Sequence, residues 1–229
     1  MRLALLCTFL LFGCCTDIVC SDGQRFLGTK YINSPLGEEK LPDTDPLIRF
    51  DAFDCTTFVE TVLANGEVEK LNRIRYKNRD IDFFNRNHFI ESEWLTNNSD
   101  IVQNISQQYG QTDVRTVIID KKNWFKITHN IDTEYAPETV HLEYLPYKNI
   151  HKIQNKETLI VLFITDNQKI RDKIGTDLAV VHMGLLLPGG ILRHASSEQK
   201  QVVDVNFYEY IERQKQNKNN IGITLVAIK

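Results

Sequence analysis

A tripeptide of one proline and two glycines, at 188–190, separates two apolar runs and constrains the fold more than any other feature of this sequence. The runs on either side, 179–187 and 191–194, are rich in Val, Leu and Ile, which favour extended strands. A short glycine-containing connection between two such runs is typical of an antiparallel hairpin. If the tripeptide forms a three-residue loop, Leu187 pairs with Ile191, and the register of the whole hairpin follows.

That register brings two histidines together. Gly184 pairs with His194, and His182 lies on the same face as Gly184, so the two histidines are diagonal neighbours. Diagonal cross-strand partners are within reach of long side chains, and Gly184 leaves space for the imidazole of His194. A two-residue loop would place the histidines on opposite faces. Taken singly, each histidine is more often a hydrogen-bonded strand residue than a catalytic one.

The rest of the chain is helical first and rich in strands afterwards. Turn-forming residues dominate 23–53, a helix is predicted over 54–64, and 67–109 carries mixed, mainly helical patterns. Further strands are predicted over 114–119, 158–164, 202–205 and 223–228, with a short helix at 207–213. This order predicts an α+β fold in which an antiparallel sheet packs on the helix at 54–64.

Residues 1–20 look like an export signal. After Met1 and Arg2, an unbroken apolar run extends to Gly13 and is too short to span a bilayer as a helix. We therefore expect an exported protein, periplasmic or secreted. Two alternatives stay open: a buried N-terminal strand or helix, and a lipoprotein signal in which Cys14 carries a lipid that attaches the protein to a membrane.

Length and charge narrow the function classes. The remaining residues, 21–229, are enough for one compact domain with its own core. The formal net charge is -3, so there is no basic excess to neutralise phosphates, and nucleic acid is not an expected partner.

Cys55 is the one cysteine outside the leader, since the other four all lie within 1–20. A single thiol cannot form an internal disulfide, so Cys55 is either a small core residue or a reactive one. Phe58 and Val62 follow it at helical spacing, which places Cys55 in the first helical turn on the buried face. Unpaired N–H groups and the positive end of the helix dipole lie there, and both favour the thiolate.

Cys55, His182 and His194 could together supply a nucleophile, a base and an orienting group. In this hypothesis His182 takes the thiol proton and later protonates a leaving amine, while His194 holds the His182 ring in the right tautomer. A metal site built from the same three residues lacks a local ligand pair such as C-x-x-C, so neither a metal nor another cofactor is expected.

Three motifs follow one another in the chain: Asp54-Cys55, His182-Met183-Gly184-Leu185 and His194-Ala195-Ser196. In this order and spacing they resemble the NlpC-type superfamily of papain-like cell-wall peptidases and amidases. Upstream, Phe26-Leu27-Gly28-Thr29-Lys30-Tyr31 is similar to the Gly-x-Pro-Tyr motif of that superfamily, with Lys30 where proline is usual. The resemblance implies a papain-like core with a half-barrel of antiparallel strands. It also implies that Tyr31 helps to stabilise the oxyanion, that Asp54 grips the substrate and that Ser196 lines the site.

Further motifs resemble one branch, the N-acetylmuramoyl-L-alanine amidase-like family. They are Asp54-Cys55-Thr56-Thr57-Phe58-Val59-Glu60, Ile74-Arg75-Tyr76, Arg86-Asn87-His88-Phe89 with Trp94, and Leu192-Arg193-His194-Ala195-Ser196-Ser197. The similarity covers nearly all of the chain after the leader. It implies hydrolysis of the bond between muramic acid and the L-alanine of the peptidoglycan stem peptide.

The long segment between Cys55 and His182 departs from the common layout of the superfamily. We interpret 67–150 as a large, mainly helical insertion that sets specificity. Within it Arg86, His88 and Trp94 are the candidate substrate-binding residues, because sugars stack on aromatic rings and hydrogen-bond to charged groups. The alternative is an exposed helix with one buried tryptophan.

The predicted protein is a monomeric, exported cysteine amidase that acts on peptidoglycan or muropeptides. The nearest alternative is an endopeptidase that cuts between D-glutamate and diaminopimelate, because Asp54 could grip a free amine in either enzyme. A non-catalytic cell-wall binding module is the alternative from another class. The presence of Cys55, His182 and His194 weighs against it.

Overall fold

The computed structural model describes residues 22–229, so the predicted export signal lies outside the described residues. The helices are α1 (Cys55–Leu63), α2 (Val68–Arg75), α3 (Leu95–Asn97), α4 (Lys121–His129), α5 (Gln168–Ile174) and α6 (Phe207–Gln214). The strands are β1 (Lys30–Tyr31), β2 (Ala52–Phe53), β3 (Val102–Asn104), β4 (Asp113–Ile119), β5 (Glu138–Pro146), β6 (Leu159–Thr165), β7 (Val180–Leu187), β8 (Ile191–Ser196), β9 (Gln201–Asn206) and β10 (Asn220–Ile228). None of the helices in this part of the chain is long and apolar enough to cross a membrane.

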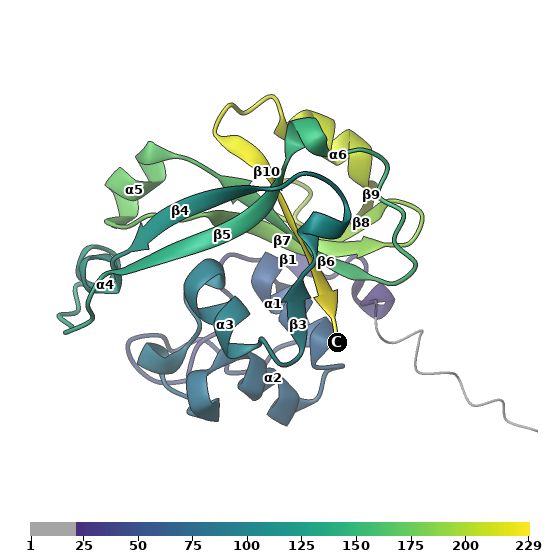
Figure 1. The fold of residues 1–229 in the computed structure, drawn as a ribbon. Coiled ribbons are helices and arrows are strands. Elements are labelled where there is room, and N and C mark those ends of the chain that lie inside the picture. The colour runs from purple at the N-terminus through teal and green to yellow at the C-terminus, as the bar shows by residue number, and fades with distance from the viewer. Residues whose placement is uncertain (1–21) are drawn as a thin grey trace, which may run out of the picture.

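The ten strands form one curved, mainly antiparallel sheet (Figure 1). Its order is β2-β1-β9-β8-β7-β6-β10-β5-β4, and β3 pairs with β10. Helices α1 to α3 lie together on one side of the sheet, whereas α6 lies on the other side. Helix α1 packs against β7 and β8 at the middle of the order. The predicted α+β class, with the Cys55 helix on an antiparallel sheet, is confirmed.

Helix α1 begins where its sequence predicts. The Asp54 side chain accepts a hydrogen bond from the Thr57 N–H at 2.8 Å, and the Thr57 hydroxyl lies 3.0 Å from the Asp54 N–H that donates to it. This reciprocal capping box satisfies two backbone donors at the helix start. The apolar face that follows is buried, with Phe58 and Val59 both 0% exposed.

The hairpin of β7 and β8 has the predicted register. Leu187 pairs with Ile191 and Leu185 with Arg193, so the loop between the strands is three residues long. Both loop glycines adopt positive φ, 87° at Gly189 and 80° at Gly190, a conformation that side chains disfavour. The prediction that His182 and His194 share one face therefore holds.

Residues 67–150, interpreted from the sequence as an insertion and called the insertion below, are less helical than predicted. The first half of the insertion contains α2, a π-helical turn at Ile90–Trp94 and α3, but its second half contains a hairpin of β4 and β5 with α4 between the two strands. Strand β5 also pairs with β10, whose residues lie about 80 positions further along the chain, as in Ile223 with Leu145. Because a pairing so distant in sequence leaves no local signal beyond an alternating pattern, the sequence analysis does not predict β5.

One buried ion pair joins α1 to the insertion. The Glu60 carboxylate on α1 accepts hydrogen bonds from Arg75 Nε at 2.8 Å and from Trp94 Nε1 at 3.0 Å. The side chains of Glu60 and Arg75 are only 5% and 3% exposed, and Trp94 is 0% exposed. A buried charge is tolerated because each member of the group has a partner.

Replacing Glu60 with alanine should destabilise the fold strongly, because it leaves the Arg75 guanidinium buried without its carboxylate. We expect a loss of about 3–5 kcal/mol in the free energy of unfolding, measured by urea denaturation. Glu138→Ala, which removes a carboxylate at an exposed position, is the matched control. It should change the free energy of unfolding by less than about 0.5 kcal/mol. Equal effects of the two substitutions would contradict a structural role for this ion pair.

Candidate active site

Cys55 occupies the first position of α1, half-buried under the sheet. Burial first and the charge of Asp54 second raise the pKa of its thiol to about 12. Hydrogen bonds from the Met183 backbone and from the side chain and backbone of Thr56 act in the opposite direction but are weaker. The predicted preference of the helix start for a thiolate is therefore outweighed, and the resting side chain is a neutral thiol.

The two predicted histidines are in contact. His182 Nε2 lies 2.8 Å from His194 Nδ1, and the two rings meet edge to face at a centroid distance of 4.9 Å. Gly184 makes this approach feasible, because a Cβ at that position would lie 2.9 Å from the Cβ of His194. Burial lowers the pKa of His182 to about 3 and that of His194 to about 4, so both rings are neutral at ordinary pH.

Tyr210 on α6 completes this group and was not predicted. Its ring lies 5.1 Å from that of His194 and 6.2 Å from that of His182, between centroids. Burial, followed by the charge of Cys55, raises the pKa of its hydroxyl to about 12. The sequence does carry a signal, since Phe207, Tyr210 and Ile211 lie at i, i+3 and i+4 and mark the buried face of α6.

Cys55 and His182 line one pocket of about 130 Å³, which we name the Cys55 pocket. Its lining includes both apolar and polar side chains. The lining residues are Cys55, Thr56, Asn87, His88, Ile90, Leu178, Val180, Val181, His182 and Met183. Strand β7 and the insertion therefore face each other across the start of α1.

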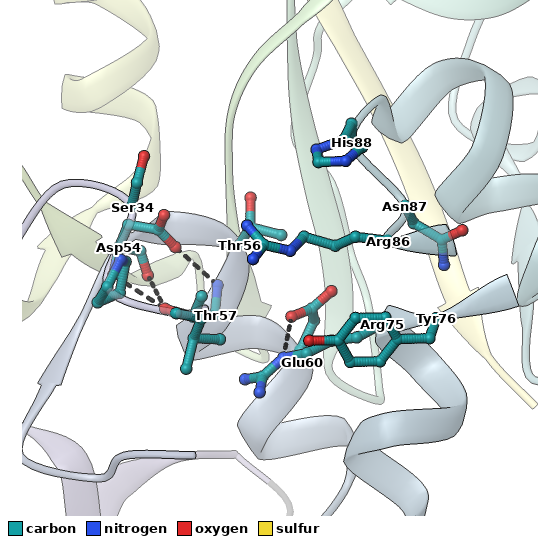
Figure 2. A pocket seen from close by; sticks show the side chains of 12 residues that line it. Ser34, Asp54, Thr56, Thr57, Glu60, Arg75, Tyr76, Arg86, Asn87 and His88 are labelled. Atoms are coloured by element: carbon teal, nitrogen blue, oxygen red, sulfur yellow. Dashed lines mark hydrogen bonds and ion pairs between the residues drawn. The ribbon is translucent and has the colours of Figure 1, made fainter. Parts of the chain in front are cut away.

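A second pocket of about 160 Å³ adjoins the first and shares Thr56, Asn87 and His88 with it. We name it the charged pocket, because two carboxylates and two guanidinium groups line it: Asp54, Glu60, Arg75 and Arg86 (Figure 2). Figure 2 shows Arg86 extending from the insertion toward Thr56 on α1. The predicted site residues Asp54, Arg86 and His88 thus line one continuous depression beside Cys55.

Arg86 is already paired within the protein. Its guanidinium donates to both oxygens of Glu38 at 2.7 Å and to Asp43 at 2.9 Å. Glu38 also accepts a hydrogen bond from the Tyr76 hydroxyl at 3.0 Å. The bidentate geometry is the one that Arg and carboxylate groups prefer, and it fastens the segment before β2 to the insertion.

A third pocket of about 370 Å³ lies beside the same histidines, and we name it the histidine pocket. It is lined mainly by hydroxyl and amide side chains together with His182, His194 and Tyr210, and also by Ile170, Val181 and Glu198. Ser196, a predicted site residue, lines it as well, and its hydroxyl accepts a hydrogen bond from the Gln199 N–H at 3.1 Å.

Of the predicted site residues Tyr31 and Trp94, the first lies near the thiol and the second does not line the pockets described above. Tyr31 on β1 pairs with Phe53 of β2, two residues before Cys55, and the charges of Cys55 and Asp54 add to burial in raising the pKa of its hydroxyl. Tyr31 therefore lies near the thiol, as its predicted role requires. Trp94 is fully buried and bonded to Glu60, so the prediction that a sugar stacks on its ring is wrong.

Among residues 22–229, no cluster of three His, Cys, Asp or Glu side chains could hold a metal ion. The arrangement that the structure does provide is a thiol and two neutral imidazoles beside a charged depression.

Comparisons with known proteins give the family and the fold of the chain. The model of the AmiA-like family, described as N-acetylmuramoyl-L-alanine amidase-like, matches residues 21–222. The solved structure of protein LPG0564 from Legionella pneumophila is similar, with a TM-score of 0.82 and 25% identity, over 93% of this chain and 88% of that one. An N-acetylmuramoyl-L-alanine amidase from Bacteroides uniformis shares the fold, with a TM-score of 0.68 and 24% identity, over 93% and 97% of the two chains. No curated protein sequence matches significantly.

The stability of the protein should depend on pH through the histidine pair. Because folding lowers both pKa values below 6.5, the unfolded chain takes up protons between pH 6.5 and about 4 that the folded protein does not. The contribution of the neutral histidines to the free energy of unfolding is fully present above pH 6.5. It is lost as the pH falls toward about 3, by on the order of 1 kcal/mol per pH unit for each histidine.

Urea unfolding across this pH range measures the effect. A variant with both His182→Asn and His194→Asn separates the histidine contribution from the titration of buried carboxyl groups. The free energy of unfolding of this variant should fall less steeply toward acid pH than that of the wild type. Parallel pH profiles for the two proteins would show that the pair is not neutral in the folded state.

Proposed function

The chain belongs to the N-acetylmuramoyl-L-alanine amidase-like family, and from this premise we propose that it is a cysteine amidase. Its proposed substrate is the amide between the lactyl group of muramic acid and the L-alanine of the stem peptide. One observation carries the proposal. Cys55 and His182 line the same pocket, and His182 Nε2 lies 2.8 Å from His194 Nδ1.

The histidine contact prepares His182 to act as a base. When His182 Nε2–H donates to His194 Nδ1, the Nδ1 atom of His182 carries no proton and can accept one from the thiol. Because the thiol pKa is about 12, the proton leaves as the sulfur attacks rather than beforehand. The oxyanion forms near the Cys55 backbone N–H at the start of α1, with Tyr31 as a second donor.

Collapse of the tetrahedral intermediate breaks the C–N bond, and its electron pair goes to the nitrogen. His182, now an imidazolium, donates its proton to that nitrogen, so the stem peptide leaves as a neutral amine. A water molecule then attacks the thioester while His182 takes its proton. Breaking the C–S bond releases the lactyl carboxylic acid, and the proton on His182 passes to the departing sulfur, which restores the thiol and the neutral imidazole.

The insertion at 67–150 is proposed to set specificity. It supplies Arg86 and His88 to the pockets beside Cys55, while Asp54 and Ser196 line the charged and histidine pockets. A cell-wall substrate implies action outside the cytoplasm, which agrees with the export signal inferred for 1–20. We propose that the protein acts as a monomer and without a cofactor.

Digestion of purified muropeptides by the wild type and by Cys55→Ala tests the activity. The wild type should release intact stem peptide, detected by mass spectrometry. The variant should lose about 10³-fold or more in kcat/KM, because the attacking atom is gone. His151→Ala, at an exposed position, is the folding and purification control.

Each alternative has its own result. Release by the wild type of a fragment that begins at diaminopimelate, with L-alanyl-D-glutamate left on the muramic acid, would indicate an endopeptidase. Binding to peptidoglycan without turnover by the wild type would indicate a binding module. Loss of turnover in EDTA with recovery in zinc would contradict the cysteine mechanism.

A further inference from the structure

The Cys55 pocket is lined by both apolar and polar side chains, and the reaction steps above use only Cys55 and His182 among them. Its apolar residues, which we call the apolar wall, are Ile90, Leu178, Val180, Val181 and Met183, and its other polar residues are Thr56, Asn87 and His88. Its volume of about 130 Å³ suits a small group rather than a whole sugar ring or amino-acid chain.

His88 presents a defined hydrogen-bond acceptor. Its Nε2 lies 2.6 Å from the carbonyl oxygen of Phe83, and a carbonyl can only accept, so Nε2 carries the proton. Burial and then the charge of Arg86 hold the pKa of His88 well below its usual value, so the ring is neutral. Nδ1 is therefore an unprotonated acceptor, and no side chain or backbone group of residues 22–229 donates to it.

Neighbouring aromatic rings hold that acceptor in place. The His88 ring packs against Trp124 at 4.7 Å and against Phe83 at 4.9 Å, between centroids. Together with the hydrogen bond to Phe83, these contacts restrict the ring before any substrate binds. An acceptor fixed in advance binds a donor at a lower entropic cost.

The chemistry of the acyl group decides which part of the substrate lies here. After attack, the acyl part stays attached to the Cys55 sulfur, so the pocket that Cys55 lines adjoins the acyl part. In a muramic acid substrate the lactyl ether is on C3 of the sugar, and the neighbouring carbon carries a secondary amide, the 2-acetamido group. That group has a methyl for an apolar wall and an N–H for an acceptor.

We propose that the Cys55 pocket binds the 2-acetamido group of the muramic acid, with its N–H donated to His88 Nδ1 and its methyl on the wall formed by Ile90 and Leu178. This assignment rests on the proposed function, since the acyl part must be a sugar acid. His88 is then a specificity-determining residue. A carboxylate at the same carbon has no proton to donate to His88 Nδ1 and would meet an apolar wall with no counter-ion, so it should bind poorly.

A cycle of two enzymes and two substrates tests the proposal. The substrates are muramyl peptides with the 2-acetamido group and with hydrogen in its place, and the enzymes are the wild type and His88→Phe, which keeps an aromatic ring against Trp124. We expect the wild type to prefer the acetamido substrate by about tenfold or more in kcat/KM, and His88→Phe to lose most of that preference. His151→Phe, the same substitution at an exposed position, should keep it.

The preference, rather than the rate, is the decisive measurement. If His88→Phe slows both substrates by the same factor, its role is only structural and the proposal is wrong. It is also wrong if the wild type hydrolyses the two substrates equally well.

A binding experiment separates this proposal from the proposed function. Cys55→Ala protein is titrated with N-acetylmuramic acid and followed by NMR, which needs no turnover. We expect nuclear Overhauser contacts between the acetyl methyl and the side chains of Ile90 and Leu178. If these contacts are seen but the wild type releases no stem peptide, the pocket assignment is supported and the amidase activity is overturned. Contacts elsewhere, or none, would overturn the pocket assignment.

Discussion

The contacts of the buried Glu60 carboxylate are the interactions on which the relative positions of α1 and the insertion depend. It projects from the helix that carries Cys55 and binds Arg75 on α2 and Trp94 in the π-helical turn. Three segments that are separate in the sequence are thereby held at fixed positions relative to the thiol. Because all three partners are buried, none can leave without exposing an unpaired polar group to the apolar core.

This ion pair connects the fold with the site. Glu60 and Arg75 line the charged pocket, and the insertion that they anchor brings His88 to the boundary between that pocket and the Cys55 pocket. The sheet contributes the other half, since β7 and β8 carry the histidine pair. Desolvation raises the pKa of the thiol and lowers that of the His182 imidazole, so in the proposed reaction charge separates only when the sulfur attacks.

Local chemistry made several features predictable. The capping residues at Asp54 and Thr57 mark the start of α1, and the loop of one proline and two glycines defines the register that joins His182 to His194. The fully buried Trp94 was misjudged, because its indole N–H finds a carboxylate partner 34 positions away along the chain. Arg86 was predicted as a substrate contact, and its partners Glu38 and Asp43 are even more distant in sequence, 48 and 43 positions away.

The sequence by itself determined the helix that carries Cys55, the hairpin that pairs the histidines and the α+β class, because capping, turn length and apolar periodicity act over a few residues. The tertiary structure alone decided that β5 joins the sheet beside β10, that Tyr210 packs on the histidines and that His88 faces the Cys55 pocket. It also decided the protonation states, since burial is set by the whole chain. Helix-start N–H groups favour a thiolate, but desolvation by the surrounding residues keeps Cys55 neutral at rest.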